Sequence, residues 1–162
     1  MRAIAADETG ARLVLGVDPG ATGALALVDP DGPRLVAALP MPVVRFGRHA
    51  IVDAAAILDW LEPFRVSAIV IEDVHAMPGQ GVASSFQFGR MAGGVESALT
   101  AVGAPIAHVT PQQWKRRAGL GREKGRSLDL ARLRLGPCAE FRRAKDHGVA
   151  EAALIALFGR PT

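Results

Sequence analysis

Apolar and polar positions follow strand and helix periods in a definite order along the chain. Three apolar runs joined by turns rich in Gly, Pro and Asp predict an antiparallel meander of strands at 13–17, 24–28 and 34–39. Pro40 and Pro42 favour a loop over 41–48, and apolar residues at helical spacing predict a helix from Ile51 to Leu61. The next apolar run, at 66–74, predicts a strand parallel to the first, since a helix separates the two.

The second half of the chain has a more helical pattern. It predicts a long helix that Ser84 or Ser85 caps and that ends near Val102, a strand at 106–109, and a short helix capped by Thr110. An amphipathic helix at 128–135 and a last helix at 146–158 follow. This order is that of an RNase H-like α/β domain with a mixed five-stranded sheet flanked by helices. We expect the 162 residues to form one such domain, with residues 1–11 as a flexible lead-in.

Two of the predicted strands end in carboxylates. Asp18 comes after an apolar strand and before the turn Pro19-Gly20-Ala21-Thr22-Gly23, where it could also be an ordinary turn residue. Glu72 follows the run 69–71, typical of a buried strand in which an unpaired acid is costly. Strand alternation sends Glu72 and Asp73 to opposite faces, so we choose Glu72 and keep Asp73 in reserve. In the predicted fold the two strands are neighbours, which would bring Asp18 and Glu72 together.

The last helix carries two further acids. Glu151 has apolar neighbours throughout 149–156, so it is expected to face a site, although it could be an ordinary helix glutamate. Asp146 could simply cap the helix. Asp146 and Glu151 are five positions apart, so they do not share a helix face, whereas His147 and Glu151 do. Asp146 can still reach inward if it precedes the first helical turn.

Carboxylates gathered in this way raise each other's pKa unless a cation lies between them. Oxygen ligands without cysteine favour Mg²⁺, with Mn²⁺ as a substitute. Two such ions about 3.5–4 Å apart activate a water and stabilise the leaving oxygen in phosphodiester hydrolysis. The predicted catalytic residues and metal ligands are Asp18, Glu72, Asp146 and Glu151, with His147 as an alternative ligand.

Positive charge is concentrated in one segment. Residues 112–145 contain eleven Lys or Arg against three acids, which leaves the rest of the chain at −5 within an overall net charge of +3. Such asymmetry is typical of a nucleic-acid-binding protein, although a solvated helix face would show it too. The residues of this segment expected to contact DNA are Lys115, Arg116, Arg117, Arg122, Lys124 and Arg126.

Cysteine content and hydropathy favour the cytoplasm. Cys138 is the only cysteine, so no internal disulfide can form. No apolar stretch approaches the roughly 18 residues of a membrane span, and residues 1–10 lack the apolar core of a secretory signal.

Five motifs in order resemble RuvC-type Holliday junction resolvases, especially the compact RuvC-like endonucleases of phages and prophages. The resemblance covers roughly residues 13–159. Its motifs are the segments 16–23, 70–72, 77–90 (Met-Pro-Gly-Gln-Gly, then Ser-Ser-Phe-Gln-Phe-Gly-Arg), 109–115 (Val-Thr-Pro-Gln-Gln-Trp-Lys) and 150–156.

The resemblance implies an RNase H-like homodimer that uses Mg²⁺ to make paired nicks across a four-way DNA junction. It maps the catalytic acids onto Asp18, Glu72 and the 146–151 segment, and places Lys115 and Lys124 near the scissile phosphate. It adds Gln80 and Arg90 to the DNA-contacting residues. The helix predicted at 84–102, with small residues at Ala92, Gly93, Gly94 and Ala98, is the expected dimer element.

The chain departs from the family at two places. Cellular members carry a ligand three residues before the last acid, where this chain has Gly148, so Asp146 and His147 both remain candidates. His75 stands where cellular members have an aromatic wedge at the junction centre, so stacking could come from Phe86 or Phe88 instead.

Three alternative functions differ in class. One is a related nuclease acting on other branched or replicating DNA, or on phage DNA during packaging. Another is an actin-like or sugar-kinase-like nucleotide-binding domain, which normally needs a second domain that 162 residues cannot supply. The third is a junction-binding module without catalysis, against which the retained acids argue.

Overall fold

The structure is a computed structural model that describes residues 12–47, 49–75, 79, 81–121 and 126–160. Gln80, Arg122 and Lys124, three of the predicted DNA contacts, and the predicted lead-in lie outside these residues. The strands are β1 (Leu13–Asp18), β2 (Ala24–Asp29), β3 (Arg34–Pro40), β4 (Val43–Phe46), β5 (His49–Val52), β6 (Val66–Glu72) and β7 (Ile106–Val109). The helices are α1 (Ala54–Leu61), α2 (Val82–Thr100), α3 (Pro111–Arg117), α4 (Arg126–Leu135) and α5 (His147–Phe158), with short 3-10 helices at Ala139–Phe141 and Ala144–Asp146.

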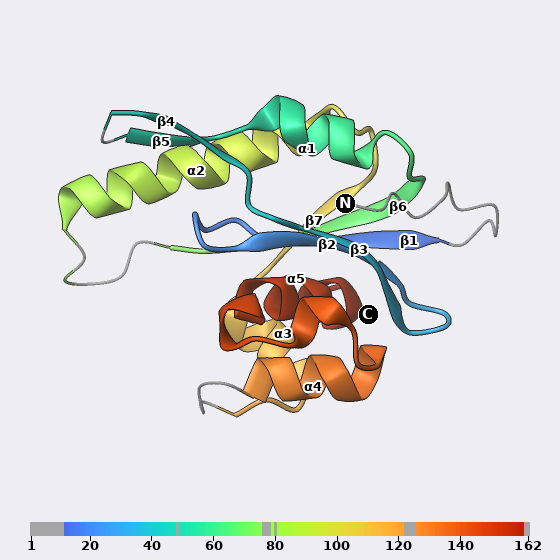
Figure 1. Ribbon diagram of the computed structural model, residues 1–162. Coiled ribbons are helices and arrows are strands. Elements are labelled where there is room, and N and C mark those ends of the chain that lie inside the picture. The colour runs from blue at the N-terminus through green and yellow to red at the C-terminus, as the bar shows by residue number, and fades with distance from the viewer. Residues whose placement is uncertain (1–11, 48, 76–78, 80, 122–125, 161–162) are drawn as a thin grey trace.

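Five strands form one mixed sheet in the order β3-β2-β1-β6-β7 (Figure 1). β2 is antiparallel to both β3 and β1, whereas β1, β6 and β7 run parallel to one another. This confirms the predicted α/β fold and the predicted pairing of the first strand with the strand that ends at Glu72. The parallel pairing follows from α1, which carries the chain back to the starting edge.

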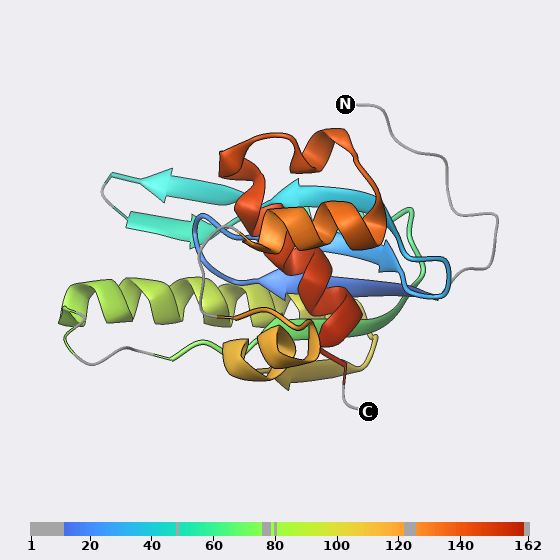
Figure 2. The ribbon, with the colours of Figure 1, turned by 90° about the horizontal axis from the view of Figure 1, so that it is seen from below.

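Helices cover both faces of the sheet (Figure 1). On one side α1 and α2 pack on Leu13, Leu15 and Val17, the odd-numbered positions of β1. On the other side α5 lies against the strands, with α3 and α4 around it (Figure 2). Because alternate side chains of a strand point to opposite faces, Val14, Gly16 and Asp18 share the α5 face.

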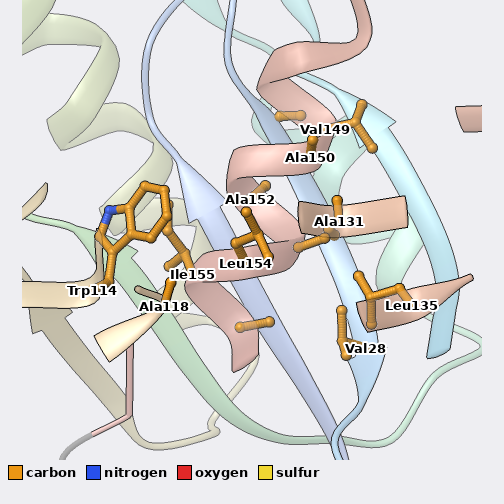
Figure 3. Close-up of a cluster of buried hydrophobic side chains, with 14 of the residues drawn as sticks. Val28, Trp114, Ala118, Ala131, Leu135, Val149, Ala150, Ala152, Leu154 and Ile155 are labelled. Carbon is orange, nitrogen blue, oxygen red and sulfur yellow. The ribbon is translucent and has the colours of Figure 1, made fainter. Parts of the chain in front are cut away.

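Helix α5 packs unusually close to β1. A Cβ atom on Gly16 would lie 2.0 Å from the carbonyl oxygen of Ala152 and 2.5 Å from the nitrogen of Ala156. Only glycine therefore fits at this point of the strand. Side chains of α5 are buried over most of its circumference, between β1 and β2 on one side and α3 and α4 on the other (Figure 3).

The segment predicted as a loop forms a hairpin instead. β4 and β5 pair antiparallel as a separate two-stranded sheet, with Val43 opposite Val52 and Val44 opposite Ile51. β-branched residues favour strands, and Gly47, with φ +58°, supplies a backbone conformation suited to the turn. The helix predicted from Ile51 to Leu61 is present only from Ala54, because Ile51 and Val52 belong to β5.

Two helix starts also differ from prediction. α1 begins at Ala54, where Asp53 Oδ1 accepts a hydrogen bond from the Ala56 nitrogen at 3.0 Å. α2 begins at Val82 after Gly81, without a side-chain cap, so neither Ser84 nor Ser85 is its N-cap. The predicted Thr110 cap is confirmed: its hydroxyl and the Gln113 side chain form a reciprocal capping box.

Part of the predicted dimer surface on α2 faces inward. Met91, Val95 and Leu99 pack against the helix's own sheet, and Ala98 is buried with them. Gly94 approaches Val52 of the hairpin. The open side of α2 carries Gly93 and the exposed side chains of Val82 and Phe86.

Candidate active site

Asp18 and Glu72 stand at the carboxyl ends of adjacent parallel strands. Val17 pairs with Ile71, so the two acids are the next residues on β1 and β6. Residues in register on neighbouring strands point to the same face, and for these two it is the face covered by α5. The two segments are 54 residues apart in sequence, and the sheet alone brings them together.

A tight glycine turn surrounds Asp18. Its Oδ1 accepts a hydrogen bond from the Gly20 nitrogen at 3.3 Å. A Cβ atom on Gly23 would lie 2.2 Å from the Asp18 carbonyl oxygen and 2.7 Å from its Cγ, so glycine is required there. Burial raises the pKa of Asp18, the Gly20 bond lowers it, and the charge of Glu151 raises it further.

Glu72 is buried, with 9% of the residue exposed, and its carboxylate has one close partner. The indole Nε1 of Trp114 donates a hydrogen bond to Glu72 Oε1 at 2.7 Å. Burial raises the pKa of Glu72 to about 7 against the lowering effect of the Trp114 bond, and the charges of Asp18 and Glu151 add to the rise. Glu72 is therefore held in an environment that penalises its ionised form.

Glu151 joins these two acids from α5. Its Oε1 accepts a hydrogen bond from Ser127 Oγ at 3.1 Å and lies 3.5 Å from Lys115 Nζ. The negative charge of Glu151 raises the pKa of both Asp18 and Glu72, while Lys115 lowers both. Three acids from β1, β6 and α5 thus form one electrostatic cluster with Lys115 beside it.

Asp146 has a different partner. Its Oδ2 accepts from the Arg143 nitrogen at 2.8 Å, and Arg143 Nη2 lies 3.1 Å from its Oδ1. These bonds lower the pKa of Asp146, the backbone bond most strongly. Its place among the metal ligands stays a prediction, since the structure uses this carboxylate to hold the 3-10 turn before α5.

His147 and Gly148 lie at the start of α5. The exposed imidazole of His147 has its Nδ1 3.3 Å from the Ala144 carbonyl oxygen, and the charge of His147 lowers the pKa of Asp18. A Cβ atom on Gly148 would lie 2.7 Å from the Thr22 carbonyl oxygen. The backbone therefore leaves no room for a ligating side chain three residues before Glu151, because α5 rests on the β1–β2 turn at that point.

The acids are neighbours without converging on one point. Among the described residues, no group of three or more His, Cys, Asp or Glu side chains is arranged to hold a single metal ion. Asp73, the reserve candidate, lies 3.6 Å from His75 Nδ1 and is half exposed. Carboxylate oxygens are suitable ligands for a hard divalent cation, but the side chains would have to rotate before they could bind the same ion.

The predicted DNA-binding residues separate into different environments. Lys115 lies at the acids, and Arg116 is exposed on the same helix. Arg117 Nη1 donates to the carbonyl oxygens of Phe158, Gly159 and Arg160 at 3.3, 3.2 and 3.1 Å, so it binds the end of α5. Arg126 begins α4, and Arg90 stacks over the Phe86 ring on α2, with 5.9 Å between Cζ and the ring centroid. Their contacts with DNA stay predictions.

Two residues of the site were not predicted. Trp114 belongs to the 109–115 motif, but nothing in its spacing links it to Glu72, 42 residues earlier. Ser127 meets Glu151 from a separate helix, 24 residues away. The burial of Glu72 makes a buried hydrogen-bond donor beside it expected, but which residue supplies that donor depends on the direction of α3 after β7.

Solved structures were found with this arrangement of elements. The structure of T. thermophilus RuvC in complex with a Holliday junction substrate matches with a TM-score of 0.66 and 24% sequence identity, over 91% of this chain and 91% of that chain. The chain has the fold of RuvC. A further structure of Thermus thermophilus RuvC matches with a TM-score of 0.63 and 24% identity, over 91% of this chain and 95% of that one.

Sequence comparison adds no relative to these structures. No protein-family model matches the chain, and no curated protein matches it. Within the part of the chain that the structure describes, no helix is both long and apolar enough to cross a bilayer.

Proposed function

We propose that this protein is a divalent-metal-dependent endodeoxyribonuclease that resolves four-way DNA junctions by symmetric paired nicks. One observation carries the proposal. Asp18, Glu72 and Glu151 come from three separated segments, share one electrostatic cluster, and occupy the rim of a RuvC fold. The related structure of T. thermophilus RuvC holds a Holliday junction substrate, which supports a branched DNA as the ligand here.

The electrostatics of the site suit a cation. Burial and mutual repulsion raise the pKa of Asp18 and Glu72, and Lys115 only partly offsets this effect. Mg²⁺ or Mn²⁺ would favour the ionised carboxylates, and when bound it would supply an activated water and charge stabilisation for phosphodiester hydrolysis. We propose Asp18, Glu72 and Glu151 as ligands. For the remaining position we favour His147 over Asp146, because Arg143 already binds Asp146.

The basic residues would hold the DNA backbone against this site. Lys115 Nζ lies 3.5 Å from Glu151 Oε1, so it can contact a phosphate placed beside the acids. Arg116 extends from the same helix, and Arg126 begins the next one. Affinity that rests on phosphate contacts falls steeply with salt concentration.

A four-way junction has two equivalent strands to cut, which suits a two-fold symmetric dimer. We propose α2 as the dimer element. Its open side supports this role, because Val82 and Phe86 are 87% and 68% exposed. Replacing Phe86 by Glu should weaken self-association in sedimentation experiments. Leu133→Glu is the matched control, since Leu133 is 78% exposed on α4.

The decisive experiment is incubation with Mg²⁺ and a labelled immobile four-way junction. We expect nicks at symmetric positions on two opposing strands, none in EDTA, and none in a linear duplex of the same sequence. Three-way junctions and forks serve as further substrates, and preferential cutting of these would favour the alternative nuclease. Absence of cleavage of every branched substrate with both Mg²⁺ and Mn²⁺ would reject the proposal.

A further inference from the structure

Trp114 occupies an unusual place for a buried aromatic residue. Its side chain is fully buried in the cluster around α5, beside Ile155 (Figure 3), yet its one polar atom meets the acid of the site. The indole Nε1 and Glu72 Oε1 are 2.7 Å apart. A buried Trp usually finds a partner for its N–H, but a backbone carbonyl or water would serve equally well.

The local fold delivers Trp114 to Glu72. Val109, the last residue of β7, is paired with Glu72. The chain then turns at Thr110, whose capping box starts α3 directly after the strand. The first turn of α3 therefore lies over the carboxyl end of β6, and Trp114 points back toward the sheet. This is a rigid path, because the capping box and Pro111 both restrict the backbone.

The ring of Trp114 has a second contact at the site. Lys115 Nζ lies over its face, 5.0 Å from the ring centroid, and also lies 3.5 Å from Glu151 Oε1. The edge of one side chain thus meets Glu72 while its face supports the lysine that pairs with Glu151. The indole has a donor and no acceptor, so it can hold Glu72 only through a carboxyl oxygen.

We propose that Trp114 is a positioning residue: its N–H occupies Glu72 Oε1 and leaves Oε2 for a divalent cation, while its ring orients Lys115. The inference rests on the proposed function, since it concerns how the same site binds its ion. Partners that orient a metal ligand commonly change affinity or activity by about 10- to 100-fold when they are removed.

The test is Trp114→Phe, which keeps an aromatic ring in the core and removes the N–H. We measure the affinity for Mn²⁺ alone from the signal of free Mn²⁺ in electron paramagnetic resonance, and junction binding in EDTA. We expect Mn²⁺ to bind about tenfold more weakly or worse, with junction binding in EDTA unchanged. Trp60→Phe is the matched control, because Trp60 contacts Phe64 on the opposite side of the sheet.

A purely structural role for Trp114 predicts another result. The Trp114→Phe variant would then melt at a lower temperature, but at temperatures where it is folded it would bind Mn²⁺ as tightly as the wild type does. That outcome would overturn the inference. If wild-type protein neither binds Mn²⁺ nor cuts junctions, the proposed function itself fails. If wild type does both and Trp114→Phe equals it, only the role of Trp114 is lost.

A fluorescence experiment tests the inference even if Trp114→Phe folds poorly, because it keeps Trp114 in place. In Trp60→Phe, Trp114 is the only tryptophan, and we expect titration with Mg²⁺ to change its emission because its partner Glu72 takes up the ion. The change should vanish in the double variant with Asp18→Asn. Unchanged Trp114 emission at Mg²⁺ concentrations that support cleavage would count against the inference.

Discussion

The two faces of β1 show how one strand serves two purposes. Leu13, Leu15 and Val17 pack large side chains against α1 and α2. The other face of β1 carries Val14, Gly16 and Asp18: a core side chain, a position without a side chain, and an acid of the site. Large side chains keep helices at a distance and stabilise by burial, whereas glycine lets a helix approach the strand itself.

This difference determines how accurately α5 is placed. α2 meets the sheet through long side chains such as Met91 and Leu99, which can adjust their rotamers. α5 meets β1 through backbone atoms at Gly16 and the β1–β2 turn through those at Gly148, and at both points even a methyl group would overlap its neighbour. The position of Glu151 relative to Asp18 therefore follows from backbone contacts, as a site with tight geometry requires.

The largest effect is expected from Asp18→Asn, which changes only the face of β1 that α5 covers and leaves the face under α1 and α2 intact. Cleavage should fall by about 1,000-fold or more, because the change removes a ligand from a site that stabilises developing charge. Junction binding should be retained, since the basic residues are unchanged. Gel-shift and cleavage assays on one preparation separate the two. Nicking at the wild-type rate would remove Asp18 from the site.

Substitutions at adjacent residues of β1 compare the two faces directly. Leu15→Ala should lower the free energy of unfolding by about 2–5 kcal/mol, because it leaves a cavity under α1 and α2, with cleavage preserved where the protein is folded. Gly16→Ala should cost about 1–3 kcal/mol and also reduce cleavage, because its methyl group must displace α5 and Glu151.

Denaturant unfolding and cleavage assays on both variants check this prediction. Equal losses of cleavage in the two would mean that the faces do not differ in function. Gly94→Ala, on α2, is a milder control, since its Cβ would lie at an ordinary 3.5 Å from Val52.

A smaller effect concerns pH. Glu72 has a pKa of about 7 in the folded protein against an ordinary value of 4.5, so the folded state holds its proton more tightly than the unfolded state. In EDTA, the contribution of Glu72 to the free energy of unfolding should therefore be most favourable at acidic pH, and it should decline as pH rises from about 4.5 to 7.

Glu72→Gln should remove that decline while keeping an oxygen for the Trp114 N–H. We expect the variant to be about 1–3 kcal/mol more stable than wild type at pH 8 in EDTA, although it is impaired in cleavage. Urea unfolding across pH measures this. A wild-type pH profile identical to that of the variant would show that burial does not penalise the charged Glu72.

Several features of the fold could be predicted because they depend on local patterns. The apolar runs and turns of β1, β2 and β3, and the capping box at Thr110, are patterns of contiguous residues. The hairpin β4–β5 was missed because the prolines favoured a loop over β4 and because Ile51 of β5 also fits a helical spacing; only the pairing between Val44 and Ile51 reveals the hairpin. Helix α2 starts without a side-chain cap, so no residue marks its beginning.

The candidate site shows the same limit. Asp18 and Glu72 could be placed together because parallel strands with a known order must meet at their carboxyl ends. Asp146 could not be assigned, because its pairing with Arg143 depends on the 3-10 turn before α5. The choice of Gly148 over a ligand was visible in sequence, but its reason, contact with the Thr22 carbonyl oxygen, was not.

The sequence by itself determined the order of the five α-helices and of the five strands of the main sheet, and the acids that end β1 and β6, because hydrophobic periodicity and turn chemistry act between near neighbours. Only the tertiary structure decided which donors meet the acids of the site: Trp114 for Glu72, and Ser127 and Lys115 for Glu151 on α5. The physical reason is that burial penalises a charged or polar group wherever it lies, while the partner that relieves the penalty is chosen by the packing of distant segments.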